Sequence, residues 1–390
     1  MKYKLLSSLY YKSKDEYNQV YKNRYNSEST YRFDFEVKQN KCFVLIDNEM
    51  LSRVEKINKL YYELYLCLNS LPSLAIEEYT KKSLIDEVTI TNEIEGIVST
   101  RKEINDILIG NGKAKRFSDI TKSYKQIFSS KYDLDNCQTI RKIYDDVVLS
   151  DIKKDDYPDG ELFRNEKVYV RDRRQNNIHV GLIPESEIMR VMKECLEMLN
   201  SDEFNSLIKI AVFHYMFGYI HPFYDGNGRT SRFITSYLLS KEFKGSLGSS
   251  VSKAIASEKD KYYKAFKVCN DEKNLGDLTF FILTFFEILI GGLEDDLNSM
   301  QSRKQQLDFY NEALKDYSVK HQAKGKLLNI LIQNKLFGEQ PVSIVELVKY
   351  SGLSDVNIRG KITELETEKL VVKTKRARAY VYSVDLDKIN

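Results

Sequence analysis

Residues 221–232 read HPFYDGNGRTSR and lie between two apolar segments whose spacing is helical. Gly226 and Gly228 permit a tight turn that points successive N–H groups into one concavity, and the following helix adds the positive end of its dipole. Arg229 and Arg232, three residues apart, place guanidinium groups near the first turn of that helix, where they suit phosphate oxygens. The stretch therefore predicts a phosphate-binding loop between two helices.

Two further side chains of this loop suit chemistry on a bound phosphate. Asp225 offers the hard oxygen ligand that a Mg²⁺ ion carried by the phosphates prefers. His221, four residues earlier, has a pKa near neutrality and suits removal of a proton from an attacking hydroxyl. Each feature alone also fits an ordinary turn or a solvent-facing arginine pair, but the whole set at this spacing favours a catalytic loop.

Length and composition indicate a globular protein with two or three modules. The 390 residues are 42% hydrophobic and 30% charged, and a net charge of +3 is too small to predict a nucleic-acid-binding surface over the whole molecule. Five cysteines without a CxxC pair indicate neither a zinc site nor a disulfide framework. The N-terminus lacks a signal-peptide pattern, so we expect a cytoplasmic protein without membrane contact.

The distribution of apolar residues predicts mostly helices, with few strands. The first forty residues have no repeating apolar face, which predicts an irregular or partly strand-like start. Helical spacing begins at Asn48, and residues 167–171 and 178–181 have the alternation of a β-hairpin. The apolar run at 278–290 is too short for a membrane span and predicts a buried core helix.

The last seventy residues have a different pattern. Three helices are expected at residues 324–336, from Ser343 onward and at 356–370, followed by two short strands at 370–373 and 379–382. This is the order of a winged-helix domain. The basic residues of the expected wing suit DNA phosphates, and a protein-docking wing fits them equally well; they are Lys373, Lys375, Arg376 and Arg378.

The stretch at 221–232 resembles the Fic family (Fido domain) signature HPFxDGNGRxxR and matches it at every fixed position. The resemblance implies an all-helical core that binds ATP with Mg²⁺ and transfers AMP to Ser, Thr or Tyr hydroxyls. It also implies a role for each motif residue: His221 as base, Asp225 as metal ligand, Gly226, Asn227 and Gly228 as phosphate cradle, and Arg229 and Arg232 as partners of the β- and γ-phosphates.

The resemblance extends to the predicted hairpin and to one later helix. Residues 168–181 resemble the family's flap, in which the strand edge at Val168, Tyr169, Val170 and Arg171 would pair with a target segment. Further arginines make the flap basic, which fits acidic targets or an ordinary solvated hairpin; they are Arg173 and Arg174. Tyr262 and Asn270 resemble the pair that contacts adenosine in the family.

Residues 91–96 read TNEIEG and resemble the family's inhibitory motif, [S/T]xxxE[G/N], with Thr91, Glu95 and Gly96 at its fixed positions. Pairing of the Glu95 carboxylate with Arg232 would occupy the place of the γ-phosphate. An exposed glutamate before a helix-ending glycine is the alternative interpretation.

These observations predict a mainly α protein with four parts. They are an N-terminal helical region carrying the inhibitory motif (1–110), an all-helical Fic core with its flap (111–295), a linker helix (296–322) and a small α+β winged-helix domain (323–390). The expected function is an autoinhibited protein adenylyltransferase that uses ATP and Mg²⁺. The alternatives are removal of AMP or transfer of another phosphate-containing group, and a nucleotide-sensing DNA-binding regulator. Self-modification, a homodimer and DNA binding by the winged helix stay open.

Overall fold

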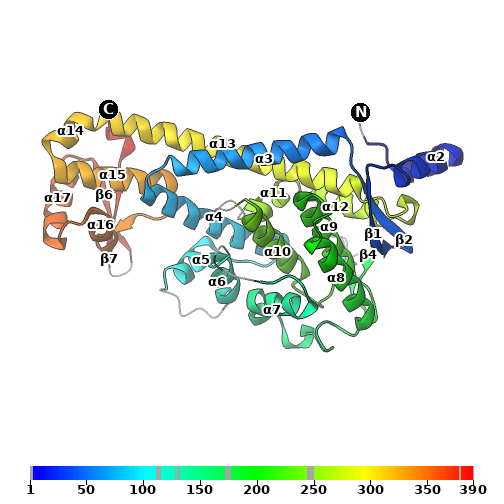
Figure 1. Ribbon diagram of the computed structural model, residues 1–390. Helices are drawn as coiled ribbons and strands as arrows, with labels where there is room; N and C mark the ends of the chain where they lie inside the picture. The colour runs from blue at the N-terminus through cyan, green and yellow to red at the C-terminus, as the bar shows by residue number, and fades with distance from the viewer. Residues whose placement is uncertain are drawn as a thin grey trace. The chain divides into compact units, whose positions relative to one another are not determined.

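The computed structural model describes residues 3–110, 116–127, 129, 132–171, 177–243, 250–376 and 379–389. Helices dominate it (Figure 1), as the sequence predicted. The chain divides into two compact units, residues 1–61 with 84–294 and residues 62–83 with 295–390. The division falls within α3 (Asn48–Asn69), α4 (Ser73–Ile94) and α13 (Thr279–Ala313).

The N-terminal segment differs from the prediction of an irregular start. It forms α1 (Leu6–Lys12), α2 (Lys14–Tyr25) and an antiparallel hairpin of β1 (Thr30–Val37) and β2 (Asn40–Leu45). The prediction missed α2 because polar residues outnumber its narrow apolar stripe of Tyr17, Val20 and Tyr21. Ser13 caps α2 by accepting a hydrogen bond from the Glu16 N–H.

Two apolar helices form the centre of the first unit. α9 (Ser206–Ile220) is buried almost all round, and α10 (Asn227–Glu242) packs against it. Because a helix that is apolar on all faces must be surrounded by protein, α9 fixes the core and α10 begins within it. The neighbouring elements are α7 (Cys137–Val147), α8 (Glu185–Asn200), α11 (Val251–Ser257) and α12 (Lys259–Cys269).

The remaining elements of the first unit surround this centre. They are α5 (Arg101–Leu108), α6 (Ser118–Lys125), the short helices η1 (Leu149–Asp151), η2 (Lys154–Asp156) and η4 (Glu272–Asn274), and a hairpin of β3 (Tyr169–Arg171) and β4 (Asn177–Val180). The hairpin lies where the sequence predicted the flap, and Tyr169 pairs with Val180. Arg173 and Arg174 lie outside the described residues.

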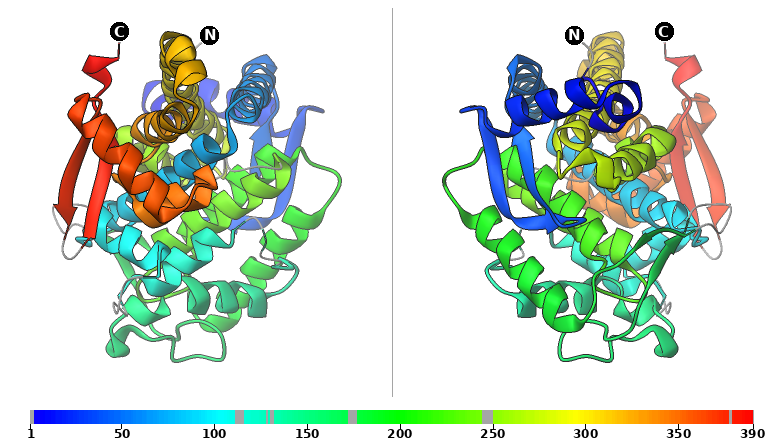
Figure 2. Two further views of the ribbon diagram at one scale, coloured as in Figure 1. Left: turned by 90° about the vertical axis from the view of Figure 1, so that its left-hand side faces the viewer. Right: turned by 90° about the vertical axis from the view of Figure 1, so that its right-hand side faces the viewer.

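The second unit contains three helices and a three-stranded sheet after α13 and α14 (Lys315–Lys320). They are α15 (Gln322–Phe337), β5 (Val342–Ser343), α16 (Ile344–Ser351), α17 (Asp355–Thr367), β6 (Val371–Arg376), β7 (Ala379–Val384) and the short helix η5 (Leu386–Lys388). The sheet order is β5-β7-β6, and β6 and β7 stand beside the helices (Figure 2). This element order matches the expected one, and its assignment as a winged helix stays a prediction. Arg378 lies outside the described residues.

The cysteines and the long apolar helices bear on two expectations from the sequence, that there is no disulfide framework and no membrane span. All five cysteines are free thiols, four of them buried. Within the described part of the chain, no helix combines the length and the apolar character needed to cross a bilayer. The apolar run at 278–290 instead supplies the buried first turns of α13, with Phe281, Ile282 and Phe286 almost inaccessible to solvent.

Candidate active site

His221 directly follows α9 and caps its end. Its backbone takes the left-handed conformation (φ 52°, ψ 61°), and its N–H donates to the Phe217 carbonyl at 3.0 Å. A residue other than glycine adopts this conformation only where its surroundings hold it. Burial lowers the pKa of His221 to about 4, and His179 and Arg164 act in the same direction. The imidazole is therefore neutral at pH 7, as a general base must be.

The loop after His221 is closed from within. The Asn227 side chain accepts from the Phe223 N–H at 2.9 Å and donates to the Phe223 carbonyl at 2.7 Å. Phe223 points inward and stacks on Tyr144, with ring centroids 3.7 Å apart. Gly226 has a φ of 81°, and a Cβ there would lie 2.9 Å from a Val148 methyl. The side chain of Asn227 thus shapes the turn, so any phosphate contact there falls to its main chain.

Arg229, in the first turn of α10, is fully buried. Its Nε, Nη1 and Nη2 atoms have no hydrogen-bond partner among the described residues. The ion pairs it makes are long, at 3.9 Å to the carboxylates of Asp151 and Asp225. Burial raises the pKa of Asp151, which weakens that carboxylate as a partner at acidic pH. A buried guanidinium with unused donors indicates a receptor for an anion.

Asp225 lies at the rim of this receptor, and its side chain is 53% exposed. Its Oδ1 accepts from the Gly226 N–H at 2.6 Å. No group of three or more His, Cys, Asp or Glu side chains suited to a metal ion occurs among the residues described. A single open carboxylate fits Mg²⁺, which takes one or two protein ligands and completes its shell with water and substrate phosphates.

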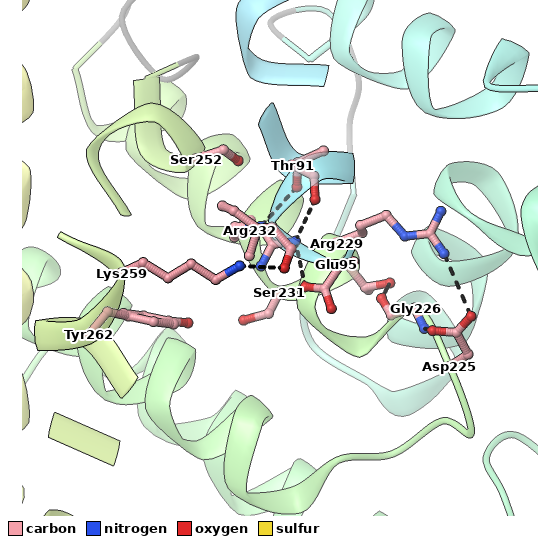
Figure 3. A network of polar contacts seen from close by, with 12 residues as sticks. Thr91, Glu95, Asp225, Gly226, Arg229, Ser231, Arg232, Ser252, Lys259 and Tyr262 are labelled. Atoms are coloured by element: carbon pink, nitrogen blue, oxygen red, sulfur yellow. Dashed lines mark hydrogen bonds and ion pairs between the residues drawn. The ribbon is translucent and has the colours of Figure 1, made fainter. Parts of the chain in front are cut away.

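Arg232 is hydrogen-bonded within the protein, in contrast to Arg229. Its Nε donates to Thr91 Oγ1 at 2.8 Å, and its Nη2 donates to the Thr91 carbonyl at 3.0 Å and to Glu95 Oε1 at 2.8 Å (Figure 3). A Cβ on Gly228 would lie 2.1 Å from the same Glu95 oxygen. The carboxylate of Glu95 therefore rests on the glycine at the start of α10, and the contact predicted between Glu95 and Arg232 is present.

The electrostatics favour an ionised Glu95. Burial raises the pKa of Glu95, but the charge and hydrogen bond of Arg232, followed by the charge of Arg229, outweigh it and hold the net pKa below its usual value. The side chain remains 30% exposed, so solvent reaches one side of it. The ion pair between Glu95 and Arg232 is thus formed at neutral pH and lies at the edge of the protein interior.

One face of α4 supplies these contacts through residues four apart. Glu87 lies one turn before Thr91, and Glu95 follows at the end of the same face. Glu87 is fully buried and accepts from the N–H of Ser252 at 2.9 Å and from its hydroxyl at 2.6 Å. Burial raises the pKa of Glu87 to about 7, although the bonds from Ser252 oppose the rise. No sequence pattern singles out Glu87, because its partner lies 165 residues away.

The helix that carries Glu95 stops directly before it. The Gly96 N–H donates to the Glu93 carbonyl at 3.0 Å, and the Ile97 N–H donates to the Asn92 carbonyl at 2.9 Å. With Gly96 at a φ of 74°, this is the Schellman arrangement that ends many helices. Lys259 Nζ adds a bond to the carbonyl of Ile94 at 2.7 Å. Glu95 therefore occupies the C-cap of α4.

The pair expected to contact adenosine is engaged within the protein. Asn270 Oδ1 accepts from the Tyr215 hydroxyl at 2.6 Å. The Tyr262 hydroxyl oxygen lies 2.8 Å from Nε2 of the buried His214. The other ring nitrogen of His214, Nδ1, lies 2.7 Å from Thr235 Oγ1 and 3.2 Å from Ser231 Oγ. The Tyr262 hydroxyl is thus held by a buried hydrogen-bond network.

The hairpin lies beside the catalytic loop. The Gly181 N–H donates to the Val168 carbonyl at 3.1 Å and extends the pairing of β3 with β4. The side chain of Tyr169 on β3 is partly exposed, at 43%. The buried Arg164, which no sequence pattern singled out, donates from Nε to the His221 carbonyl at 2.9 Å.

Comparison with known proteins is consistent with this geometry. Residues 134–239 match the Fic/DOC family. Two curated relatives are both named "Protein adenylyltransferase Fic". That of Drosophila mojavensis is 31% identical over 160 residues, which cover 38% of this chain and 28% of the relative. That of Drosophila grimshawi is 33% identical over 127 residues, which cover 32% and 23%. The chain thus spans about a quarter of the length of these relatives.

A solved structure extends the likeness in fold. The crystal structure of a Fic family protein from Desulfovibrio desulfuricans G20 aligns with a TM-score of 0.54 at 18% identity, over 87% of this chain and 97% of that one. At this identity the likeness concerns the fold alone. The helical surroundings of α9 and α10, the loop between them and the family match agree: residues 134–239 of this chain form a Fic/DOC domain.

Proposed function

We propose that this chain is a protein adenylyltransferase, which transfers AMP from ATP to a hydroxyl side chain of a target protein. The observation that carries the proposal is the buried guanidinium of Arg229, whose donors have no hydrogen-bond partner among the described residues, one loop away from the neutral imidazole of His221. The match to the Fic/DOC family over the same residues supports it, as do the names of the two Drosophila relatives.

In the proposed reaction, the oxygen of a Ser, Thr or Tyr hydroxyl attacks the α-phosphorus of ATP. A bond forms between that oxygen and phosphorus, the bond from the α-phosphorus to the oxygen bridging it to the β-phosphorus breaks, and pyrophosphate leaves with the electron pair. His221 accepts the hydroxyl proton. A positioned base contributes about 10²–10⁴-fold to the rate.

The start of α10 would hold the triphosphate. The main-chain N–H groups of residues 226–228 and the helix dipole favour negative charge at this point. Arg229 supplies its unused donors to the phosphates, and Arg232 does so once Glu95 leaves. Asp225 would hold the Mg²⁺ ion that accompanies the nucleotide, and that ion would offset part of the phosphate charge.

We further propose that Glu95 inhibits the transfer. Its carboxylate touches Gly228 and Arg232, so it competes with the outermost phosphate for the same donors. The Glu95 carboxylate and the outermost phosphate would repel each other if both lay beside Arg232. A fully bound triphosphate therefore requires Glu95 to move.

The nucleoside and the target would approach from opposite sides of the loop. Tyr262, through its oxygen, and Asn270 would face the adenosine group. The strand edge at residues 168–171 would pair with a segment of the target through main-chain hydrogen bonds. Five further points remain predictions: the protein target, self-modification, a homodimer, a cytoplasmic location and DNA binding by the C-terminal unit.

The proposal is tested with the full-length Glu95→Gly chain, Mg²⁺ and nucleotides labelled at the α-phosphate. We expect labelled AMP on the chain itself or on proteins of a cell extract, and a loss of at least about 10²-fold in the Glu95→Gly/His221→Ala double variant. Parallel reactions with CTP, GTP and UTP separate AMP transfer from transfer of another nucleotide, and release of free AMP from labelled protein reveals hydrolytic removal of AMP. Absence of both labelling and calorimetric ATP binding would refute the proposal.

A further inference from the structure

Arg164 is a buried cation whose hydrogen-bond partners are all main-chain carbonyls. Its side chain is completely inaccessible to solvent. The guanidinium donates from Nε to His221 at 2.9 Å, from Nη1 to Glu166 at 2.5 Å and from Nη2 to Leu182 at 2.8 Å, with a longer Nη2 contact to Ile220 at 3.5 Å. Burying a guanidinium without a carboxylate is costly, so it has to be offset by the bonds that it makes.

These carbonyls belong to two different parts of the site. Ile220 and His221 end α9 and include the base, whereas Glu166 and Leu182 lie just outside the two strands of the hairpin. The main chain reinforces the connection, because the Leu182 N–H donates to the Ile220 carbonyl at 3.1 Å and the Arg164 N–H to the Pro222 carbonyl at 3.2 Å. One planar group thus joins the base to both ends of the hairpin.

Gly181 shows how closely the two parts approach. A Cβ at this position would lie 2.3 Å from Arg164 Nη2 and 3.0 Å from His221 Cβ. No side chain fits there without displacing the guanidinium or the base. The left-handed backbone of His221 sets the direction of its imidazole, and Arg164 binds the carbonyl of that same residue.

We propose that Arg164 is a positioning residue for the transfer reaction: it holds His221 in its left-handed conformation and fixes the hairpin at a set distance from the base. The inference rests on the proposed function, because the hairpin would present the target hydroxyl and the base would receive its proton. The fork geometry suits this task, since its donors reach several carbonyls at once where an ammonium group offers a single point of charge.

The test compares Arg164→Gln and Arg164→Lys in the full-length Glu95→Gly chain. We expect kcat for AMP transfer to fall about 10–100-fold in both, with the KM for ATP within about twofold, because the phosphates bind at α10 and misplacement of a catalytic group acts on the chemical step. Arg24→Gln is the control, since Arg24 is also largely buried and donates to a main-chain carbonyl, that of Lys4 at 2.7 Å, but its recorded polar partners, which include Asp277 at 3.1 Å, lie outside the site.

A second readout does not depend on activity. The chain has four histidines, so the imidazole signals can be followed one by one in NMR titrations, with His221 assigned by its Ala variant. The charged or titratable groups that act on His221 are His179 and Arg164, which lower its pKa, and Glu95, which raises it. We expect the titration midpoint of His221 to rise in Arg164→Gln, and to stay unchanged in Arg164→Lys and in Arg24→Gln.

Gly181→Ala is an independent variant in case Arg164→Gln does not fold. The added methyl pushes on both the guanidinium and the base, so we expect the same fall in kcat with a nearly constant KM for ATP. A kcat loss no larger than that of Arg24→Gln, together with an unmoved His221 midpoint in Arg164→Gln, would overturn the inference. If the Glu95→Gly parent neither transfers AMP nor binds ATP, the proposed function fails, and the titration still decides whether Arg164 acts on His221.

Discussion

The two arginines near the start of α10 differ in how they are used. Arg232, on the side facing α4, is bonded to Thr91 and Glu95. Arg229, on the side facing η1, is equally buried, yet all its nitrogens lack hydrogen-bond partners among the described residues. One guanidinium is bonded to the protein itself, and the other has donors that would be available to the proposed phosphate ligand.

The two states of a buried guanidinium differ in their effect on stability and in their availability to a ligand. An unused buried guanidinium lowers stability, because its solvation is lost without replacement. A guanidinium paired with a carboxylate of the same chain stabilises the fold but is not available to a ligand. The following substitutions exchange or remove these roles.

Arg229→Met carries the largest expected effect. In the Glu95→Gly chain we expect AMP transfer to fall about 10²–10³-fold, the usual effect of removing one group that stabilises developing charge. The free energy of unfolding should stay within about 1 kcal/mol, because an apolar side chain of similar length replaces a cation whose ion pairs are long, at 3.9 Å, and which has no hydrogen-bond partner among the described residues. Labelling assays and urea unfolding measure the two quantities. A large loss of stability would show that Arg229 is paired in solution.

Arg232→Met, unlike Arg229→Met, should lower the free energy of unfolding. Removing it leaves Glu95 and the Thr91 carbonyl without their donor, so we expect the otherwise unchanged chain to lose about 1–3 kcal/mol, a value reduced from that of a fully buried pair because Glu95 is 30% exposed. Urea unfolding beside Arg229→Met gives the direct comparison. Equal stabilities of the two variants would contradict the division of roles.

Glu95→Gly should raise the rate of AMP transfer by about tenfold or more, which corresponds to about 1.4 kcal/mol of released competition. Glu93→Gly is the control, because Glu93 is an exposed glutamate two residues earlier on the same helix. If both variants raise transfer equally, loosening of α4 and not loss of the carboxylate would be responsible. Quantified labelling at fixed ATP concentration distinguishes the two.

Glu87→Gln should change how stability depends on pH, by about 1–3 kcal/mol. With its pKa raised to about 7, Glu87 holds its proton in the native state between pH 4.5 and 7, where the unfolded chain has released it. Native stability from this group therefore declines as pH rises through that window, and Gln removes the decline. Urea unfolding at pH 5 and pH 8 measures how much the free energy of unfolding changes between these pH values, with Glu93→Gln as control. The same change in Glu87→Gln and in the unaltered chain would be inconsistent with a protonated Glu87.

Sequence analysis predicted those parts of the candidate site whose residues are close together along the chain. The loop at 221–232 could be predicted because its turn, its helix start and its two arginines follow one another along the chain. The ion pair of Glu95 with Arg232 could be anticipated only through a family resemblance, since 137 residues separate the two. Arg164, Glu87 and His214 escaped detection because each acts through a partner that only the fold brings near.

The N-terminal helices show a second limit. α2 fully buries only Tyr17, and its capping serine is visible only once the helix is known to begin there. Its apolar stripe of Tyr17, Val20 and Tyr21 is too narrow to stand out among the polar residues of this segment. The expectation of a partly strand-like start agrees with the hairpin of β1 and β2.

The position of Glu95 at the very end of α4 has a mechanical consequence. Withdrawal of its carboxylate does not require the long helix to slide or rotate. Only the last turn has to unwind, which breaks the terminal bonds between residues 92–93 and 95–97 and the grip of Lys259 on Ile94. Helix ends fray far more readily than their middles, so under the proposed inhibition a hinge of a few residues would release Arg232 while the body of the helix stays in place.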